Sequence, residues 1–82
     1  MLTLKIVSPD RIEFDGEAQS VCVPGMLGNF EILTGHAPII SSLMAGTVEY
    51  VTTQGEKKQV AVTGGFVSVH QNEVSLCVEK EA

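Results

Sequence analysis

The chain has 82 residues, of which 44% are hydrophobic and 18% are charged, and its mean hydropathy is +0.23. This composition excludes a disordered acidic segment and predicts a small folded protein. Five Lys and Arg against ten Asp and Glu give a formal net charge of −5 at pH 7. Because phosphate backbones and anionic lipids repel a protein of that sign, we expect neither nucleic acid as a partner nor direct lipid insertion.

No stretch of the sequence has the length of a membrane span. Polar residues interrupt every apolar run within a few positions, whereas a membrane-spanning helix needs roughly 20 apolar residues. The N-terminus also lacks the charged, apolar and cleavable regions of a secretory signal peptide. We therefore expect a soluble protein that stays where it is made. Under reducing conditions there, Cys22 and Cys77 should be free thiols.

The first part of the chain alternates apolar and polar residues with the period of two that is typical of β-strands. Residues 2–7 form the first run, and a Ser-Pro-Asp turn follows it. The alternation returns over 11–17, where Gly16 should end or bulge the strand. A third run covers 21–23, and we expect Pro24 to close it because proline has no backbone N–H.

Residues 24–29 are predicted to form a loop that contains two glycines. Met26 and Leu27 lie at its tip, where they have little chance of reaching a core. The strand pattern resumes over 30–33, and residues 34–38 break it again. The two exposed apolar side chains therefore indicate a loop with a role outside the core.

The second half of the chain also consists of short strand-like runs separated by turn residues. Residues 39–43 are too few for periodicity to classify. The runs 47–53 and 58–63 are separated by a Gln-Gly-Glu-Lys segment and predict a hairpin. A last pair of runs, 66–70 and 74–78, flanks a Gln-Asn turn.

These runs predict an all-β fold, a flattened β-sandwich or barrel of about eight to ten short strands. Glycines are spread along the chain as turn residues rather than gathered in a linker, and no internal repeat occurs. No ten-residue stretch carries a stripe with a period of 3.6, so we expect no helix. Residues 1–82 should form a single domain.

The residue types that could support catalysis lack a catalytic pattern. On paper, histidines and cysteines could join carboxylates in a triad, because triads are defined in space. His70 lies beside a turn and is interpreted as a solvated residue, and Cys22 and Cys77 alternate with valine and leucine as strand fillers. The other histidine, His36, is separated from His70 by half the chain, so no metal-ligand spacing occurs. We expect no catalytic residue, no metal and no cofactor.

Two other functions stay open at this point. The segment Gly55-Glu56-Lys57-Lys58 is similar to the lysine-bearing turn of lipoyl and biotinyl carrier domains, which are also acidic β-sandwiches of this length. Those domains carry Asp-Lys-Ala or Met-Lys-Met at the turn, and this chain carries neither. A solvated lysine pair is the alternative interpretation. The other hypothesis is a small β enzyme of an unrecognised type.

Several turns of the chain are distinctive in their order and spacing. They are Val7-Ser8-Pro9-Asp10, Phe14-Asp15-Gly16, Val23-Pro24-Gly25 with Gly28, the segment 32–38, and Gly64-Gly65-Phe66 followed by Val69. In this order they closely resemble the N-terminal β-sandwich of the epsilon subunit of F-type ATP synthases, which is called delta in mitochondria. The Gly-His-Ala-Pro element is the most specific part, and the resemblance covers nearly the whole chain.

The resemblance implies a subunit of the rotary central stalk that has no active site of its own. In that family the sandwich packs beside the gamma subunit and sits on the polar loops of the membrane c-ring. It clamps gamma to the ring, so that proton or sodium flow is coupled to ATP synthesis. The implied location is peripheral, on the cytoplasmic face of the inner (plasma) membrane.

The resemblance also assigns two sets of contact residues. The c-ring should contact the loop that consists of Gly25, Met26, Leu27, Gly28 and Asn29. The gamma subunit should contact Ser8 and the segment that consists of Gly35, His36, Ala37 and Pro38. For the histidine, a role in capping its own turn stays open beside direct contact with gamma. The apolar pair at the loop tip departs from the more polar or acidic residues of many family members.

The chain also departs from the family pattern at its end. Family members commonly continue from the sandwich into a helical hairpin that can run along gamma and inhibit ATP hydrolysis. Here the sequence stops at Glu79-Lys80-Glu81-Ala82, so we expect no C-terminal helical hairpin. Either the chain is cut or it is a short member of the family, and no inhibitory role is assigned to it.

Overall fold

The computed structural model describes residues 1–81, which form eight β-strands joined by turns. The strands are β1 (Leu2–Val7), β2 (Ile12–Gly25), β3 (Gly28–Ile32), β4 (Ile39–Leu43), β5 (Gly46–Thr52), β6 (Lys57–Val62), β7 (Gly64–His70) and β8 (Glu73–Glu79). Among these residues no helix occurs, which confirms the all-β prediction. It follows that no helix within the described range could cross a membrane.

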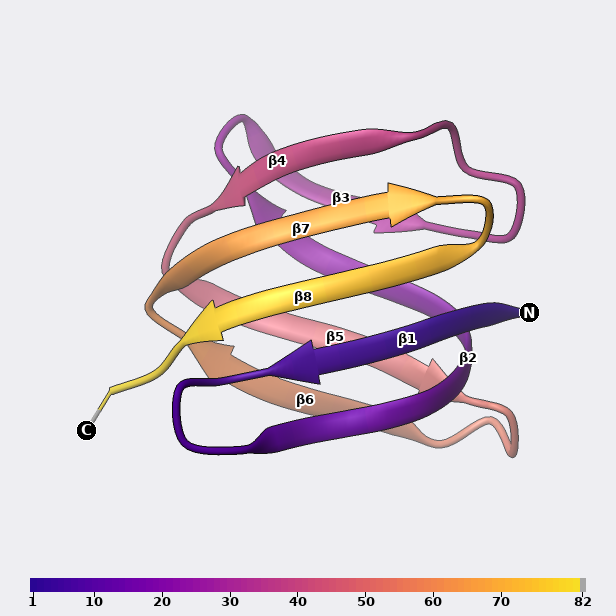
Figure 1. Cartoon of the computed structure of the whole chain (residues 1–82), viewed down its shortest axis with the longest axis horizontal. Helices are drawn as coiled ribbons and strands as arrows, with labels where there is room; N and C mark the ends of the chain where they lie inside the picture. Colours follow the sequence, from indigo (N-terminus) through magenta and orange to yellow (C-terminus); the bar gives the residue numbers. More distant parts are fainter. Residues whose placement is uncertain (82) are drawn as a thin grey trace.

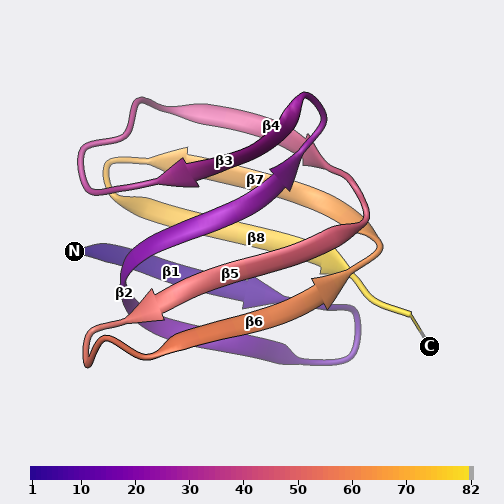
Figure 2. The same cartoon turned by 180° about the vertical axis from the view of Figure 1, so that it is seen from behind.

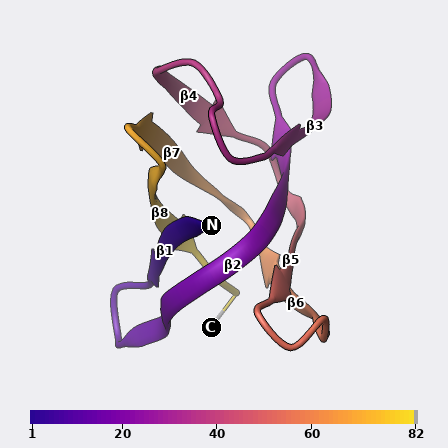
Figure 3. The ribbon, with the colours of Figure 1, turned by 90° about the vertical axis from the view of Figure 1, so that its right-hand side faces the viewer.

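The strands lie in two facing layers (Figures 1 and 2). One layer consists of β1, β8, β7 and β4 in that order, and the other contains β3, the second half of β2, β5 and β6. Seen from the side, the two layers enclose the core (Figure 3). β1 and β8 run parallel, and the other strand pairs are antiparallel. The predicted β-sandwich is confirmed.

Strand β2 is the element that belongs to both layers. It has 14 residues, and its first half, through Ala18, pairs with β1. Its second half pairs with β5 and with β3, and the register shifts between Ala18 and Ser20. The shift is a β-bulge, which bends a strand and increases its twist. β2 therefore crosses from one layer to the other at the bulge (Figure 3).

The prediction of separate strands over 11–17 and 21–23 is wrong, because β2 is continuous. Gly16 stays in the strand and pairs with Leu4. A Cβ at this glycine would lie 3.2 Å from Cζ of Phe14, whose ring packs on Tyr50 with 4.6 Å between centroids. The glycine thus makes room for an aromatic pair instead of ending the strand. Pro24 also stays in β2, opposite Asn29.

The core is built from the inward-facing residues of every alternating run. β1 buries Leu2, Leu4 and Ile6 completely, and its neighbour β8 buries Val74 and Leu76. β4 and β7, in the same layer, add Leu43, Val67 and Val69, and the opposite layer supplies buried residues that include Val21, Val23, Ile32, Val48 and Tyr50. Full burial of side chains of this size stabilises the fold by about 1.5–3 kcal/mol each.

The predicted turns at 71–72 and between β5 and β6 are confirmed, whereas the predicted loop over 24–29 is wrong in extent, because only 26–27 lie outside β2 and β3. Residues 39–43, which periodicity could not classify, form β4. Residues 71 and 72, between β7 and β8, both have positive φ, as a two-residue hairpin turn of type I′ requires. The β5–β6 hairpin turns at 53–56, where the N–H of Gly55 donates to the carbonyl of Thr52 at 3.0 Å. In β4, Leu43 faces the core and Ile40 faces outward.

We expect the substitution Gly65→Ala to destabilise the fold more than Gly55→Ala. Both glycines have positive φ, 140° and 85°, so alanine strains the backbone at either position by about 1–2 kcal/mol. A Cβ at Gly55 meets open space. A Cβ at Gly65 would lie 2.9 Å from Cα of Val78 and closer still to the carbonyl oxygen of Cys77. Free energies of unfolding from urea titrations test this difference, and equal losses in the two variants would contradict it.

Candidate functional site

The predicted ring-facing loop is a tight β-hairpin that protrudes from one end of the sandwich (Figure 1). Gly25 pairs with Gly28, so that Met26 and Leu27 form the two-residue turn between β2 and β3. The side chain of Leu27 is fully exposed and that of Met26 is 61% exposed. The prediction that neither side chain reaches the core is confirmed. Asn29 is exposed on the returning strand.

A second turn lies beside the base of this hairpin. Gly25 pairs with Leu43 at the end of β4, and the backbone N–H of Met44 donates to the carbonyl of Pro24 at 2.8 Å. Met44 is 49% exposed. Sequence reasoning did not find this residue, because it follows a strand that could not be classified. Turns 26–27 and 44–45 together form what we call the hairpin end of the sandwich.

The predicted gamma-facing segment lies at the opposite end, in the β3–β4 loop (Figures 1 and 2). The N–H of Gly35 donates to Oδ1 of Asn72 at 2.7 Å, which ties the loop to the β7–β8 turn. The imidazole Nδ1 of His36 lies 2.7 Å from the carbonyl oxygen of Ala37, so this nitrogen donates when it is protonated. His36 thus caps its own turn, while Ala37 and Pro38 are exposed.

Ser8, the other predicted gamma-facing residue, lies in the β1–β2 loop, which is at the other end of the long axis from the β3–β4 loop (Figures 1 and 2). It is 7% exposed, and its N–H donates to the carbonyl of Arg11 at 2.9 Å. Its hydroxyl lies 3.0 Å from Oε2 of Glu13. The structure therefore does not bring the two predicted gamma contacts together, and it places them at opposite ends.

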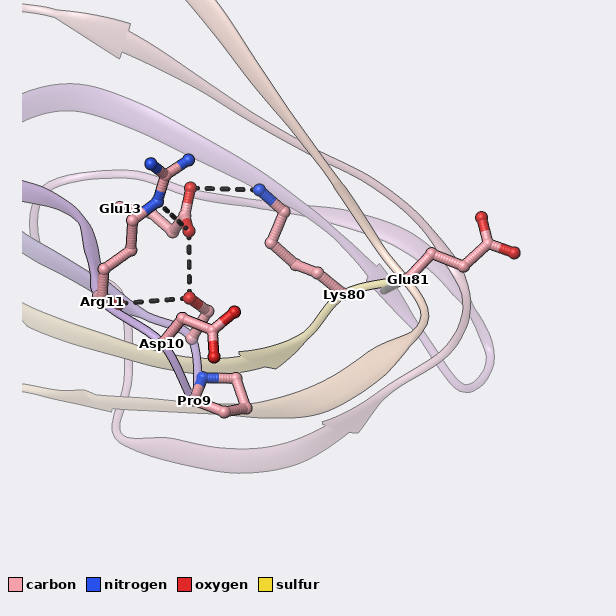
Figure 4. A pocket seen from close by; sticks show the side chains of 7 residues that line it. Pro9, Asp10, Arg11, Glu13, Lys80 and Glu81 are labelled. Atoms are coloured by element: carbon pink, nitrogen blue, oxygen red, sulfur yellow. Dashed lines mark hydrogen bonds and ion pairs between the residues drawn. The ribbon is translucent and has the colours of Figure 1, made fainter.

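Glu13 is the centre of a polar cluster at this end (Figure 4). Its carboxylate accepts hydrogen bonds from the Ser8 hydroxyl, from Nε of Arg11 at 3.1 Å and from Nζ of Lys80 at 3.2 Å. The side chain is 9% exposed. The hydrogen bond from Arg11, followed by those from Ser8 and Lys80, holds the pKa of the Glu13 carboxyl below its usual range. The hydrogen bond from Lys80 ties the residue after β8 to the start of β2.

The outer face of β4, β7 and β8 is uncharged over its central part. Ile40 is 81% exposed and Phe66 is 59% exposed. Ser42, Phe66 and Cys77 lie opposite one another on the three strands, and Ile40, Ser68 and Ser75 form the adjacent row. We call these six residues the neutral face.

Two shallow grooves continue the neutral face toward both predicted gamma contacts. Ser8 and Pro9 line one groove together with Phe66 and Cys77. At the other end, Pro38 lines a second groove together with Ile40, Ser68 and His70. Ser8 and residues 35–38 are therefore joined by a continuous strip of surface on one side of the sandwich.

The remaining candidate reactive groups stand apart from one another. Cys22 and Cys77 are free and lie on different layers, as strand residues, which agrees with the sequence interpretation. Burial, followed by the charges of Glu31 and Glu49, raises the pKa of the Cys22 thiol, which keeps it protonated. His70 is exposed at the end of β7, as predicted. Across residues 1–81 no group of three or more His, Cys, Asp or Glu side chains could hold a metal ion.

The described geometry agrees with comparisons to known proteins. Residues 1–81 match the model of the family described as "ATP synthase, Delta/Epsilon chain, beta-sandwich domain". The chain belongs to this family. The resemblance noted in the sequence is confirmed. Because the chain belongs to this family, the alternative of a lipoyl or biotinyl carrier domain has no support. Lys57 and Lys58 lie at the start of β6 and pair with Glu49 at 3.6 Å and Glu56 at 3.9 Å.

Curated relatives of this chain are named ATP synthase epsilon chain. The protein of Nostoc sp. is 37% identical over 78 residues, which cover 94% of this chain and 57% of the relative. The protein of Leptospira borgpetersenii is 40% identical, with 99% and 63% covered. The protein of Chlorobaculum tepidum is 37% identical, with 95% and 89% covered. The chain thus spans less than two thirds of the first two relatives and most of the third.

Solved structures show the same fold in two mitochondrial ATP synthases. A chain in the Euglena gracilis complex of OSCP, F1 and c-ring superposes with a TM-score of 0.88 at 23% identity, covering 94% of this chain and 49% of that chain. A chain in the Tetrahymena thermophila central stalk and c-ring superposes with a TM-score of 0.77 at 18% identity, covering 94% and 62%. At these identities the likeness supports the fold.

We expect the substitution Glu13→Gln to lower the free energy of unfolding at pH 7 and to have a smaller effect in acid. The folded-state pKa of Glu13 is lowered, so its ionised form stabilises the fold above the unfolded-state pKa of about 4.3. That stability is lost as the pH falls through the lower folded-state value. Glu17→Gln, on the exposed part of the same strand, is the matched control. Urea unfolding of both variants across this pH range measures the effect, and a pH-independent difference would contradict it.

Proposed function

We propose that this chain is a non-catalytic rotor subunit of an F-type ATP synthase, which clamps the gamma subunit to the c-ring. In this role it couples proton or sodium flow to ATP synthesis. The observation that carries the proposal is the family match across residues 1–81. The relatives' printed name, ATP synthase epsilon chain, supports it. Residues 1–82 act as one domain, peripheral to the membrane on its cytoplasmic face.

The gamma subunit lies along the neutral face in this proposal. Ser8 and residues 35–38 are at opposite ends of the sandwich, so one partner contacts both only if it spans the surface between them. That surface carries Ile40 and Phe66, which are exposed although large and apolar. Burial of such side chains contributes about 1.5–3 kcal/mol each before the costs of association. Ser8 itself is 7% exposed and supports the loop that borders the groove.

The c-ring contacts the hairpin end, through Gly25 to Asn29. The β2–β3 hairpin belongs to the layer across from β7 and β8 (Figures 1 and 3), so in this proposal the two partners do not compete for surface. Gly25 has a structural reason to be glycine, since a Cβ there would lie 2.7 Å from Cε1 of Phe30. The tight turn presents Met26 and Leu27 to the ring.

The decisive experiment is co-purification with gamma from the same organism. The wild-type chain should form a one-to-one complex, and Phe66→Asp should weaken it by about tenfold or more because a buried carboxylate replaces an apolar contact. Met26→Asp, an apolar-to-acidic change at the hairpin end, is the matched control and should bind gamma normally. No complex with the wild-type chain would refute the function, and equal binding by all three would refute the neutral face as the gamma surface.

A further inference from the structure

The two turns of the hairpin end are held together by backbone contacts. Besides the bond from Met44 N–H to Pro24, Gly46 approaches the same proline, because a Cβ at Gly46 would lie 2.9 Å from Cβ of Pro24. Pairing of Gly25 with Leu43 adds a third link. Turn 44–45 is therefore fixed beside the base of the hairpin, so that its exposed side chains lie close enough to turn 26–27 for one partner to contact both.

The surface of these two turns is apolar and uncharged. Among residues 1–81, Met26, Leu27 and Met44 are three of eight exposed large hydrophobic residues, and Ala45, which follows Met44, is also exposed. The segments 24–30 and 43–48 contain none of the chain's 15 charged residues. In a protein with a net charge of −5, such a surface offers no ion pair to a charged partner.

We infer that Met44 and Ala45 form part of the ring contact and that this contact is apolar, made with an uncharged polypeptide surface of the ring's loops. The inference rests on the proposed function and adds a second turn and a mode of binding to it. Apolar contacts without ion pairs do not weaken when salt screens charges. Attachment to the ring is therefore insensitive to ionic strength.

A polypeptide surface fits better than a lipid surface. The chain is acidic, and anionic headgroups repel acidic proteins. The apolar tip is also small, with only three large side chains, whereas stable membrane anchoring needs more apolar area or a basic patch. A folded polypeptide partner can enclose the same side chains and remove them from water.

The test measures binding of the full chain to c-rings in lipid nanodiscs, with empty nanodiscs of the same lipids beside them. The dissociation constant should change by less than about threefold between 0.05 and 0.5 M salt. Met44→Asp should weaken binding by about tenfold or more. Met44→Leu should bind like the wild type, and so should the matched control Ile40→Asp on the neutral face. Gamma binding by Met44→Asp shows that the variant is folded.

The outcomes separate the inference from the function on which it rests. If the wild-type chain binds no c-ring, with or without gamma, the proposed function fails. If it binds the ring but weakens steeply with salt, or if Met44→Asp binds like the wild type, the apolar two-turn contact is refuted and the function stands. Equal binding to empty nanodiscs would show a lipid surface instead and overturn the inference.

Discussion

The continuity of β2 is the constraint on which the rest of the structure depends. A short chain can bury a core only if its two layers stay together, and β2 pairs with β1 in one layer and with β5 and β3 in the other. The bulge after Ala18 turns the strand without breaking it. Both Gly16 and Pro24, residues that usually interrupt strands, are kept in it by local packing and pairing. Loss of this strand's pairing would separate the layers.

The same strand also determines where the candidate surfaces lie. β2 starts beside the loop that holds Ser8 and ends in the turn that presents Leu27, so one rigid element joins the Glu13 cluster to the hairpin end. Because inward residues fill the core, the outward residues of β4, β7 and β8 are left to form the neutral face. Two partners that bind the hairpin end and the neutral face are thus held in a fixed relative orientation.

Much of the fold could be predicted from the sequence, because one buried face imposes a period of two on β1, β5, β7 and β8. Periodicity failed for residues 39–43, where serines and isoleucines share both faces, and so Ile40 could not be recognised as outward-facing. Periodicity also predicted two separate strands where β2 is continuous, because the pairing that keeps Gly16 in the strand is made with Leu4 on another strand. The Glu13–Lys80 contact spans 67 positions and has no local signal, although Arg11 and Glu13 are near neighbours in sequence.

For the candidate site, sequence reasoning could identify exposed apolar tips but not what surrounds them. Leu27 was recognisable because a glycine turn cannot bury it, whereas Met44 joins it only through the backbone bond to Pro24. The hydrogen bond between Met44 and Pro24 joins backbone groups, so the turns keep their conformation without any contribution from their side chains. The exposed apolar side chains at the tips are therefore available to contact a partner. Selection for binding can then change residues 26, 27 and 44 without disturbing the core beneath them. Substitutions at these exposed turn positions should therefore change the stability of the isolated fold little.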